Sequence, residues 1–395
     1  MNPEKFREMQ QAIRGENLDG WLFCNFRHRD QLADEILGID PGTTNSRLWF
    51  YVVPASNEGA SQEAMGILHA IEQNALDSGA LPGKRTSYRS REELLAQLAP
   101  LAGKRWGCHI SRSITAISFL DAGTAALLEQ AGLKLVSAAG LLQRFKGLLS
   151  PAGIEAHERA AAHLYEIVES AWAEVQKFFA QGKPLYEGNI QRLMLEEFKK
   201  RYLITHHPPI VAAGVNSGNP HYDIAHNGAL FKENDVIQFD LWAKEPGPAG
   251  IYADISWVGV YAKSAPPAAE KAFANLLQAR EGAYQFIKEE LEAGRRPEGA
   301  DVDHRAREIL DGFGYADAIC HRTGHGIDTE VHGSGVNMDS VEFPDSRLLL
   351  DGSCFSLEPG IYFHDFGMRT EIDVYIKDGR PLVSGKDRQF TLLCC

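Results

Sequence analysis

The apolar positions of residues 151–395 follow the same order of elements twice. They recur with a helical period between residues 154 and 180, and again over residues 266–292, where prolines occupy the first turn. A shorter helical pattern follows each long one, at residues 190–202 and 300–313. Each helix pair precedes two strand-like apolar runs, at residues 235–244 and 251–263 and then at 353–363 and 368–376. The pattern therefore predicts two halves of helix, helix and strand pair, related by a pseudo-twofold axis.

The first part of the chain has a mixed pattern. Aromatic and branched runs at residues 18–26, 47–53 and 104–111 predict strands, whereas residues 90–99 and 121–132 predict helices. Small, turn-forming residues at 146–154 separate this part from the repeated pattern. We therefore predict an α+β protein with a smaller N-terminal α/β domain, residues 1–149, and a larger C-terminal domain, residues 150–395.

Composition and charge narrow the class of protein. The 395 residues are 44% hydrophobic and 24% charged, and the formal net charge is −13. This composition is typical of a globular protein, and the acidic balance argues against nucleic acid or an anionic membrane as partner. The six cysteines are scattered, the first twenty residues contain no apolar signal segment, and no apolar stretch approaches the ~18 residues needed to span a bilayer. We expect a cytoplasmic protein.

Four acidic residues interrupt the two pairs of apolar runs. Asp240 and Asp254 flank a turn-like segment centred on Gly247, so an antiparallel hairpin would place them opposite each other. Glu358 and Glu371 flank a second turn-like segment in the same way. Facing carboxylates repel each other, and a bound cation resolves that repulsion. Carboxylates with one or two imidazoles suit divalent Mn, Co, Zn or Fe.

Histidines lie between and before these predicted hairpins. His321, His325 and His332 lie in one glycine-rich segment of twelve residues. Glycine allows the backbone of such a segment to approach a site closely. His221 occupies a Gly/Asn/Pro-rich loop just before the first hairpin. We predict ligand or proton-transfer roles for the three histidines at 321–332, and we expect His221 to enter the site. The chain has no P-loop, no G-x-G-x-x-G and no G-x-S-x-G motif, so nucleotide-binding and serine-hydrolase functions lack support.

Five residues resemble, in order and context, the metal ligands of the pita-bread metallopeptidases of family M24. GHGIDTEVHG is similar to the histidine motif of that family, and FSLEPGIY and MRTEIDVYI are similar to its two glutamate motifs. The additional N-terminal domain points to the creatinase, prolidase and aminopeptidase P branch. The resemblance implies two divalent metal ions, manganese being our first choice, and a pita-bread fold. It assigns the metal ligands as Asp240, Asp254, His325, Glu358 and Glu371.

The resemblance also implies a mechanism and partners. A hydroxide that bridges the two metals would attack the Xaa-Pro bond of a dipeptide or of a peptide N-terminus, and Glu358 would shuttle the proton. His221 and His332 would hydrogen-bond the substrate, His321 would line the pocket, and Arg369 would orient a carboxylate. We expect a small peptide as substrate and a homodimer as the assembly.

Two departures from the family pattern affect the substrate pocket. Gly333 stands where the family usually has an acid, and Ser256-Trp257 replaces an arginine or threonine after the second aspartate. A reshaped pocket would leave hydrolysis intact and relax the proline preference. Two alternatives therefore remain open: the same metal centre acting on a non-peptide small molecule as a C–N hydrolase or lyase, and a non-catalytic binding protein.

Overall fold

The computed structural model describes residues 1–56, 62–385 and 388–395. The chain forms two compact units, Met1–Lys146 and Gly147–Cys395, which we call the N-terminal and C-terminal units. The expected domain boundary between residues 149 and 150 stays a prediction. Among the described residues, no helix combines the length and the apolar character that a membrane span requires.

The N-terminal unit contains a six-stranded mixed sheet with the strand order β4-β3-β2-β1-β5-β6. Trp21 and Phe23 of β1 belong to one apolar cluster, and Leu22 between them belongs to another, so both faces of the sheet are buried. Ser90 caps α3 by accepting the Glu93 amide at 3.2 Å, which confirms the helix predicted there. The elements of this unit are α1 (Pro3–Gly15), β1 (Gly20–Asn25), α2 (Gln31–Leu37), β2 (Trp49–Pro54), β3 (Met65–His69), β4 (Lys84–Tyr88), α3 (Arg91–Leu98), β5 (Arg105–Cys108), α4 (Ala122–Gln130), β6 (Lys134–Ser137) and α5 (Ala139–Leu142).

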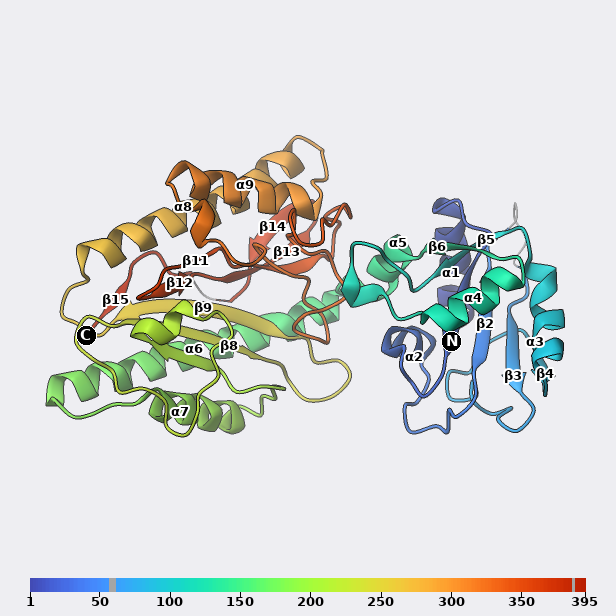
Figure 1. Ribbon diagram of the computed structural model, residues 1–395, viewed down its shortest axis with the longest axis horizontal. Helices are drawn as coiled ribbons and strands as arrows, with labels where there is room; N and C mark the ends of the chain where they lie inside the picture. The colour runs from blue at the N-terminus through green and yellow to red at the C-terminus, as the bar shows by residue number, and fades with distance from the viewer. Residues whose placement is uncertain (57–61, 386–387) are drawn as a thin grey trace. The chain divides into compact units, whose positions relative to one another are not determined.

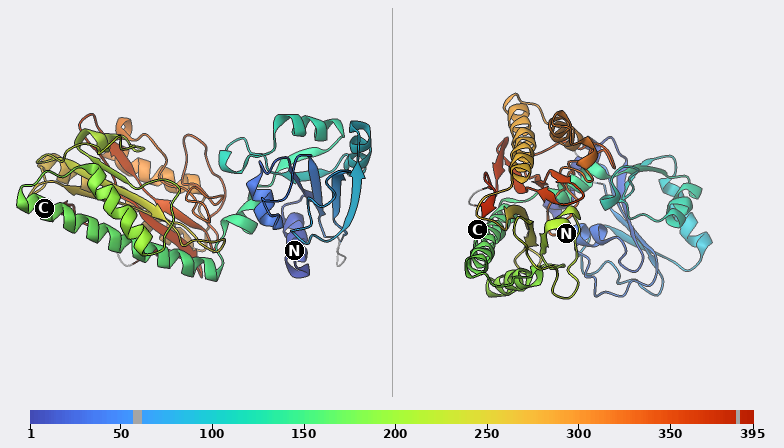
Figure 2. Two further views of the ribbon diagram at one scale, coloured as in Figure 1. Left: turned by 90° about the horizontal axis from the view of Figure 1, so that it is seen from below. Right: turned by 60° about the vertical axis from the view of Figure 1, so that its left-hand side comes forward.

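The C-terminal unit repeats helix, helix and strand pair, as the apolar pattern predicts. Figure 1 shows α6 and α7 on one side of the strands and α8 and α9 on the other, and Figure 2 shows the same layers from two further directions. The first half consists of α6 (Pro151–Gln181), α7 (Glu187–Lys200), β7 (Ile210–Ala213), β8 (Val236–Ala243) and β9 (Ala253–Val260). The second half consists of α8 (Pro267–Glu292), α9 (Gly299–Gly312), β10 (Cys354–Leu357), β11 (Gly360–Tyr362), β12 (Gly367–Arg369), β13 (Ile372–Lys377) and β14 (Arg380–Val383), and β15 (Leu393–Cys394) closes the chain.

Among the described residues of the C-terminal unit, the strands form three sheets. The first has the order β15-β9-β8-β7, the second β10-β13-β14, and the third contains β11 and β12. In β8 and β9 the odd-numbered residues, such as Phe239 and Ile255, pack against α6 and α7 in one apolar cluster. Because side chains alternate along a strand, Asp240, Asp254 and Ser256 share the opposite face. This face carries the candidate site.

The first hairpin differs from its predicted register. Asp240 pairs with Ser256 and Asp254 pairs with Trp242, so the two aspartates are diagonal neighbours. The sequence-based prediction that they lie directly opposite each other is wrong by two residues. A displacement of two residues leaves both side chains on the same face, because the side-chain period of a strand is two. The error arises because β8 and β9 are joined by the nine-residue loop 244–252, whose centre the sequence does not define.

The second hairpin keeps its predicted register across a break. Leu357 pairs with Ile372 and Gly360 pairs with Arg369, so one register runs on both sides and places Glu358 opposite Glu371. At the break both acids bond elsewhere: the amide of Glu358 donates to the Thr323 carbonyl at 2.7 Å, and the amide of Glu371 donates to the Ser256 carbonyl at 3.3 Å. The second contact joins the two hairpins directly at the site.

Candidate metal centre

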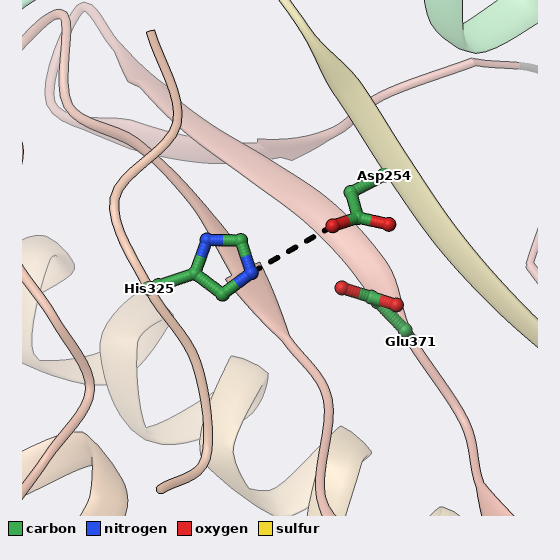
Figure 3. A group of neighbouring side chains, drawn as sticks. All are labelled: Asp254, His325 and Glu371. Carbon is green, nitrogen blue, oxygen red and sulfur yellow. Dashed lines mark ion pairs between the residues drawn. The ribbon is translucent and has the colours of Figure 1, made fainter. Parts of the chain in front are cut away.

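Three buried side chains from separate parts of the C-terminal unit converge on one point. Asp254 comes from β9, His325 from the loop before β10, and Glu371 from the residue before β13 (Figure 3). One ligand atom from each residue lies within 4.8 Å of those of the other two, and His325 Nε2 is 3.7 Å from Asp254 Oδ2. This arrangement offers two carboxylates and one imidazole to a single cation.

The donor set fits a divalent metal ion. Asp254 Oδ1 and Glu371 Oε1 are buried and have no hydrogen-bond partner among the described residues. A buried carboxylate oxygen without a partner carries a desolvation cost that a bound cation removes. Two such oxygens beside one imidazole match the preferences of Mn, Co, Zn and Fe.

The electrostatics of the site also call for a cation. Burial, followed by the charges of Glu371 and Asp240, raises the pKa of the Asp254 carboxyl well above its ordinary value. Burial and the charge of Glu358 raise the pKa of Glu371 in the same way. Burial raises the pKa of Asp240 as well, although the Arg369 guanidinium acts in the opposite direction. Without a metal ion, these carboxylates can keep their charges at neutral pH only at a cost in free energy.

Glu358 lies at the accessible edge of the cluster. Its Oε1 atom is 3.3 Å from His325 Nε2 and accepts a hydrogen bond from Ser356 Oγ at 3.1 Å. Its side chain is half-buried, whereas Asp254, His325 and Glu371 are buried. Glu358 therefore contacts the cluster and stays partly accessible to solvent.

Arg369 is buried and links several site residues. It donates to Asp240 Oδ2 and, at 3.2 Å, to the hydroxyl of Tyr362, and its Nε atom is 3.7 Å from Glu358 Oε2. The predicted role of Arg369 in orienting a carboxylate remains a prediction, and Asp240 is the carboxylate that it contacts most directly. Burial acts against the charge of Arg369, but Asp240 and its neighbours raise the pKa of Arg369 well above its ordinary value.

The sequence analysis named Ser256 only as a departure from the family pattern near the substrate pocket and did not predict its place at the metal cluster. Its hydroxyl lies 3.1 Å from Asp240 Oδ1 and 2.8 Å from Glu371 Oε2, and it accepts a hydrogen bond from Arg369 Nε at 3.2 Å. The signal was its position two residues after Asp254, which puts both side chains on one face of β9. Tyr362 was missed as well, and it stands on the second hairpin four residues after Glu358.

Asp373 lies behind the cluster and was also missed. Its Oδ2 atom accepts the backbone amide of Asp254 at 2.7 Å, and its Oδ1 atom is buried without a partner among the described residues. The carboxylate therefore fixes the backbone of one predicted ligand. Its position two residues after Glu371, on the same face of the second hairpin, was the available signal.

The other predicted histidines lie at different distances from the cluster. The rings of His332 and His325 meet edge to face with centroids 4.4 Å apart, and His321 Nε2 is 2.8 Å from the Tyr362 hydroxyl. His221 is exposed in the loop before β8. The charge of His325, together with burial, lowers the pKa of His332, and burial lowers that of His325 to about 3, so both imidazoles are neutral at pH 7.

Trp257 does not reach the metal cluster. It pairs with Phe239 on the face of β9 that packs against α6, and its ring meets that of Tyr165 at 6.0 Å. The expectation that Trp257 reshapes the substrate pocket is therefore wrong, since the strand alternation turns it towards the helices. Ser256, not Trp257, occupies the site face at this point.

Comparisons with known proteins support the interpretation of the Asp254, His325 and Glu371 cluster as a metal site. Residues 155–378 match the sequence profile of metallopeptidase family M24. The Xaa-Pro dipeptidase of Lactobacillus delbrueckii subsp. lactis is 32% identical over 185 residues, which is 46% of each chain. The putative dipeptidase YkvY of Bacillus subtilis is 31% identical over 186 residues, or 47% of each chain, so these matches span about half the length of the curated relatives.

A solved structure shows the same fold over the whole chain. The dipeptidase PepE from Mycobacterium ulcerans aligns with a TM-score of 0.73 and 21% identity over 99% of this chain and 97% of its own. The pita-bread architecture with a smaller N-terminal domain is thereby confirmed. The histidine and glutamate motifs predicted this family. The match to the family profile covers more than half of the residues, and this chain therefore belongs to metallopeptidase family M24.

Proposed function

We propose that this chain is a dinuclear metal-dependent hydrolase that cleaves the Xaa-Pro bond of dipeptides or of peptide N-termini. The observation that carries the proposal is the buried convergence of Asp254, His325 and Glu371, with two carboxylate oxygens that have no partner among the described residues. Peptidase activity is supported by family membership and by the relative named Xaa-Pro dipeptidase.

The chain offers five ligands for two divalent cations, with manganese as our first choice. Asp254, His325 and Glu371, whose ligand atoms converge, would hold these ions together with Asp240 and Glu358. When bound, such ions act as Lewis acids and make a water nucleophilic at neutral pH. Ser256 and Arg369 would keep the carboxylates apart and oriented, because they contact Asp240, and Ser256 also contacts Glu371.

The remaining residues act on the substrate and on protons. We assign Glu358 the transfer of a proton from the attacking water to the leaving nitrogen, since it is the half-buried carboxylate at the edge of the cluster. His332 and His221 would hydrogen-bond the substrate and the oxyanion that develops on the scissile carbonyl. His321, held by the Tyr362 hydroxyl, would line the pocket.

A proline-directed site must accept a tertiary amide. The nitrogen of an Xaa-Pro bond has no hydrogen to donate, so recognition relies on ring packing and on donors to the carbonyl oxygen. The imidazoles beside the cluster can supply such donors. We also keep a homodimer and a cytoplasmic location as parts of this proposal.

A substrate panel tests the proposed function. Purified protein loaded with Mn²⁺ is incubated with Ala-Pro, Ala-Pro-Ala and Ala-Ala-Ala, and the products are separated by chromatography, with chelator-stripped protein as the control. Cleavage of Ala-Pro alone identifies a prolidase, and release of Ala from Ala-Pro-Ala identifies an aminopeptidase P activity. If the fully metal-loaded protein cleaves none of them, the proposal is wrong, and the non-peptide small-molecule alternative is favoured.

A further inference from the structure

His332 stands in a short loop, residues 328–334, which we call the His332 loop. Asp328 at its start is buried, with 1% of its surface exposed. Its Oδ1 atom accepts the amide of Glu330 at 2.9 Å, and its Oδ2 atom accepts both the amide and the hydroxyl of Ser334 at 2.9 Å. One carboxylate therefore binds the chain on both sides of His332.

The glycine after His332 makes room for this carboxylate. A Cβ atom at Gly333 would lie 2.6 Å from Asp328 Cγ and 2.8 Å from Oδ2. Contacts this short do not occur between real atoms, so no other residue fits at position 333 while Asp328 keeps its place. The sequence has Gly333 at the position after His332 where the family usually has an acid. In the structure, the carboxylate of Asp328 packs against the backbone at this position.

Backbone contacts anchor the His332 loop at several points. The carbonyl of Asp328 accepts the Tyr252 amide at 3.0 Å, and the amide of Gly333 donates to the Gly326 carbonyl at 2.7 Å. The Lys244 ammonium donates to the carbonyl of Thr329. The loop is therefore fixed to the connection between β8 and β9 and to the segment that carries His325.

The His332 ring itself has no hydrogen bond within the described parts of the chain, and its side chain is exposed. Within the part of the chain that the structure describes, its ring contact is the edge-to-face packing against His325. Because no hydrogen bond from a described side chain orients the ring, the backbone of the loop and the contact with His325 set where the imidazole points. We propose that Asp328 is a positioning residue, which holds His332 at the metal cluster for its bond to the substrate.

This proposal rests on the proposed function, because it takes His332 as a substrate contact. Asp328→Asn replaces one acceptor oxygen by a donor and so breaks the bonds on one side of the loop. We expect kcat for Ala-Pro to fall by about ten-fold or more, while metal content and KM stay within about two-fold of wild type. Asp339→Asn is the matched control, since Asp339 is equally buried and accepts three backbone amides in a neighbouring loop without a predicted site residue.

A double-mutant cycle distinguishes positioning from general stability. If Asp328 acts through His332, Asp328→Asn causes no further loss of kcat in a His332→Ala background. An equal loss in both backgrounds, or wild-type kcat in Asp328→Asn, overturns the proposal. Wild-type kcat in His332→Ala overturns it together with the assigned role of His332.

Two further measurements keep the proposal testable if Asp328→Asn folds poorly or if peptides are not cleaved. Gly333→Ala leaves Asp328 in the chain but displaces its carboxylate, and we expect the same loss of kcat. Histidine ring NMR of the protein loaded with diamagnetic Zn²⁺ needs no turnover. The His332 resonance, assigned with His332→Ala, is expected to shift in Asp328→Asn and not in Asp339→Asn. An unchanged His332 resonance overturns the positioning role whether or not Xaa-Pro hydrolysis is observed.

Discussion

Replacing Ser256 by alanine tests whether its hydroxyl links the carboxylates of the two hairpins, Asp240 and Glu371, into one metal site. The Ser256 hydroxyl has one proton and can donate to Asp240 or to Glu371, at 3.1 Å and 2.8 Å, while it accepts from Arg369. A hydrogen bond to a charged group contributes about 1.5–3 kcal/mol. Loss of the hydroxyl leaves one carboxylate and the Arg369 Nε group less well held in a site where Ser256 is fully buried.

The expected result follows from that magnitude. A loss of about 1.5–3 kcal/mol corresponds to roughly a 10- to 100-fold change in an equilibrium constant. We therefore expect Ser256→Ala to weaken Mn²⁺ affinity, measured by competition with a chelator, by about ten-fold or more, and to lower kcat/KM for Ala-Pro to a similar extent.

The control is another buried serine outside the cluster. Ser353 is buried and accepts the Leu350 amide at 3.0 Å, and among the described residues its hydroxyl bonds to none of the site carboxylates. Ser353→Ala should leave Mn²⁺ affinity within about two-fold of wild type. The reasoning is refuted if Ser256→Ala binds Mn²⁺ as tightly as wild type, or if both variants weaken it equally.

Three other predictions address ligands, histidines and pH. Asp240→Asn, Asp254→Asn or Glu371→Gln should abolish activity and the second equivalent of bound metal by elemental analysis, and full activity in any of them would contradict a dinuclear centre. His325→Ala should lower metal content, whereas His332→Ala should retain metal and lose turnover; the opposite result would reverse the two roles. Burial raises the pKa values of the Asp254 and Glu371 carboxyls in the folded state. As pH rises, the unfolded chain therefore loses these protons at a lower pH than the folded chain does. The metal-free protein should accordingly lose stability above about pH 4. Thermal unfolding between pH 5 and 8 should therefore show the stabilisation by Mn²⁺ growing with pH, and a constant difference would contradict it.

The sequence predicted most of the C-terminal unit because its helices and strands have clear periods. The helical patterns at 154–180 and 266–292 correspond to α6 and α8, and the four strand runs correspond to β8, β9 and the segments from β10 to β13. The second hairpin also kept its predicted register, since a short turn defines its centre.

Features that depend on three-dimensional packing could not be predicted. The register of the first hairpin depends on a nine-residue loop, and Trp257 was assigned to the wrong face although its odd position matches Phe239 and Ile255. Asp328 gave no signal on its own, because its role depends on the close packing of its carboxylate against Gly333. Ser256 could have been found by applying the strand period to Asp254.

The central claim is that a metal-loaded cluster of Asp254, His325 and Glu371 hydrolyses Xaa-Pro bonds. The most direct test is to strip the protein with a chelator, titrate it with Mn²⁺, and follow bound metal and Ala-Pro hydrolysis in the same samples. We predict that the stripped protein is inactive and that activity rises with metal to a plateau at two equivalents per chain. Full hydrolysis of Ala-Pro by the stripped protein, or two bound equivalents with no hydrolysis of any Xaa-Pro peptide, would contradict the claim.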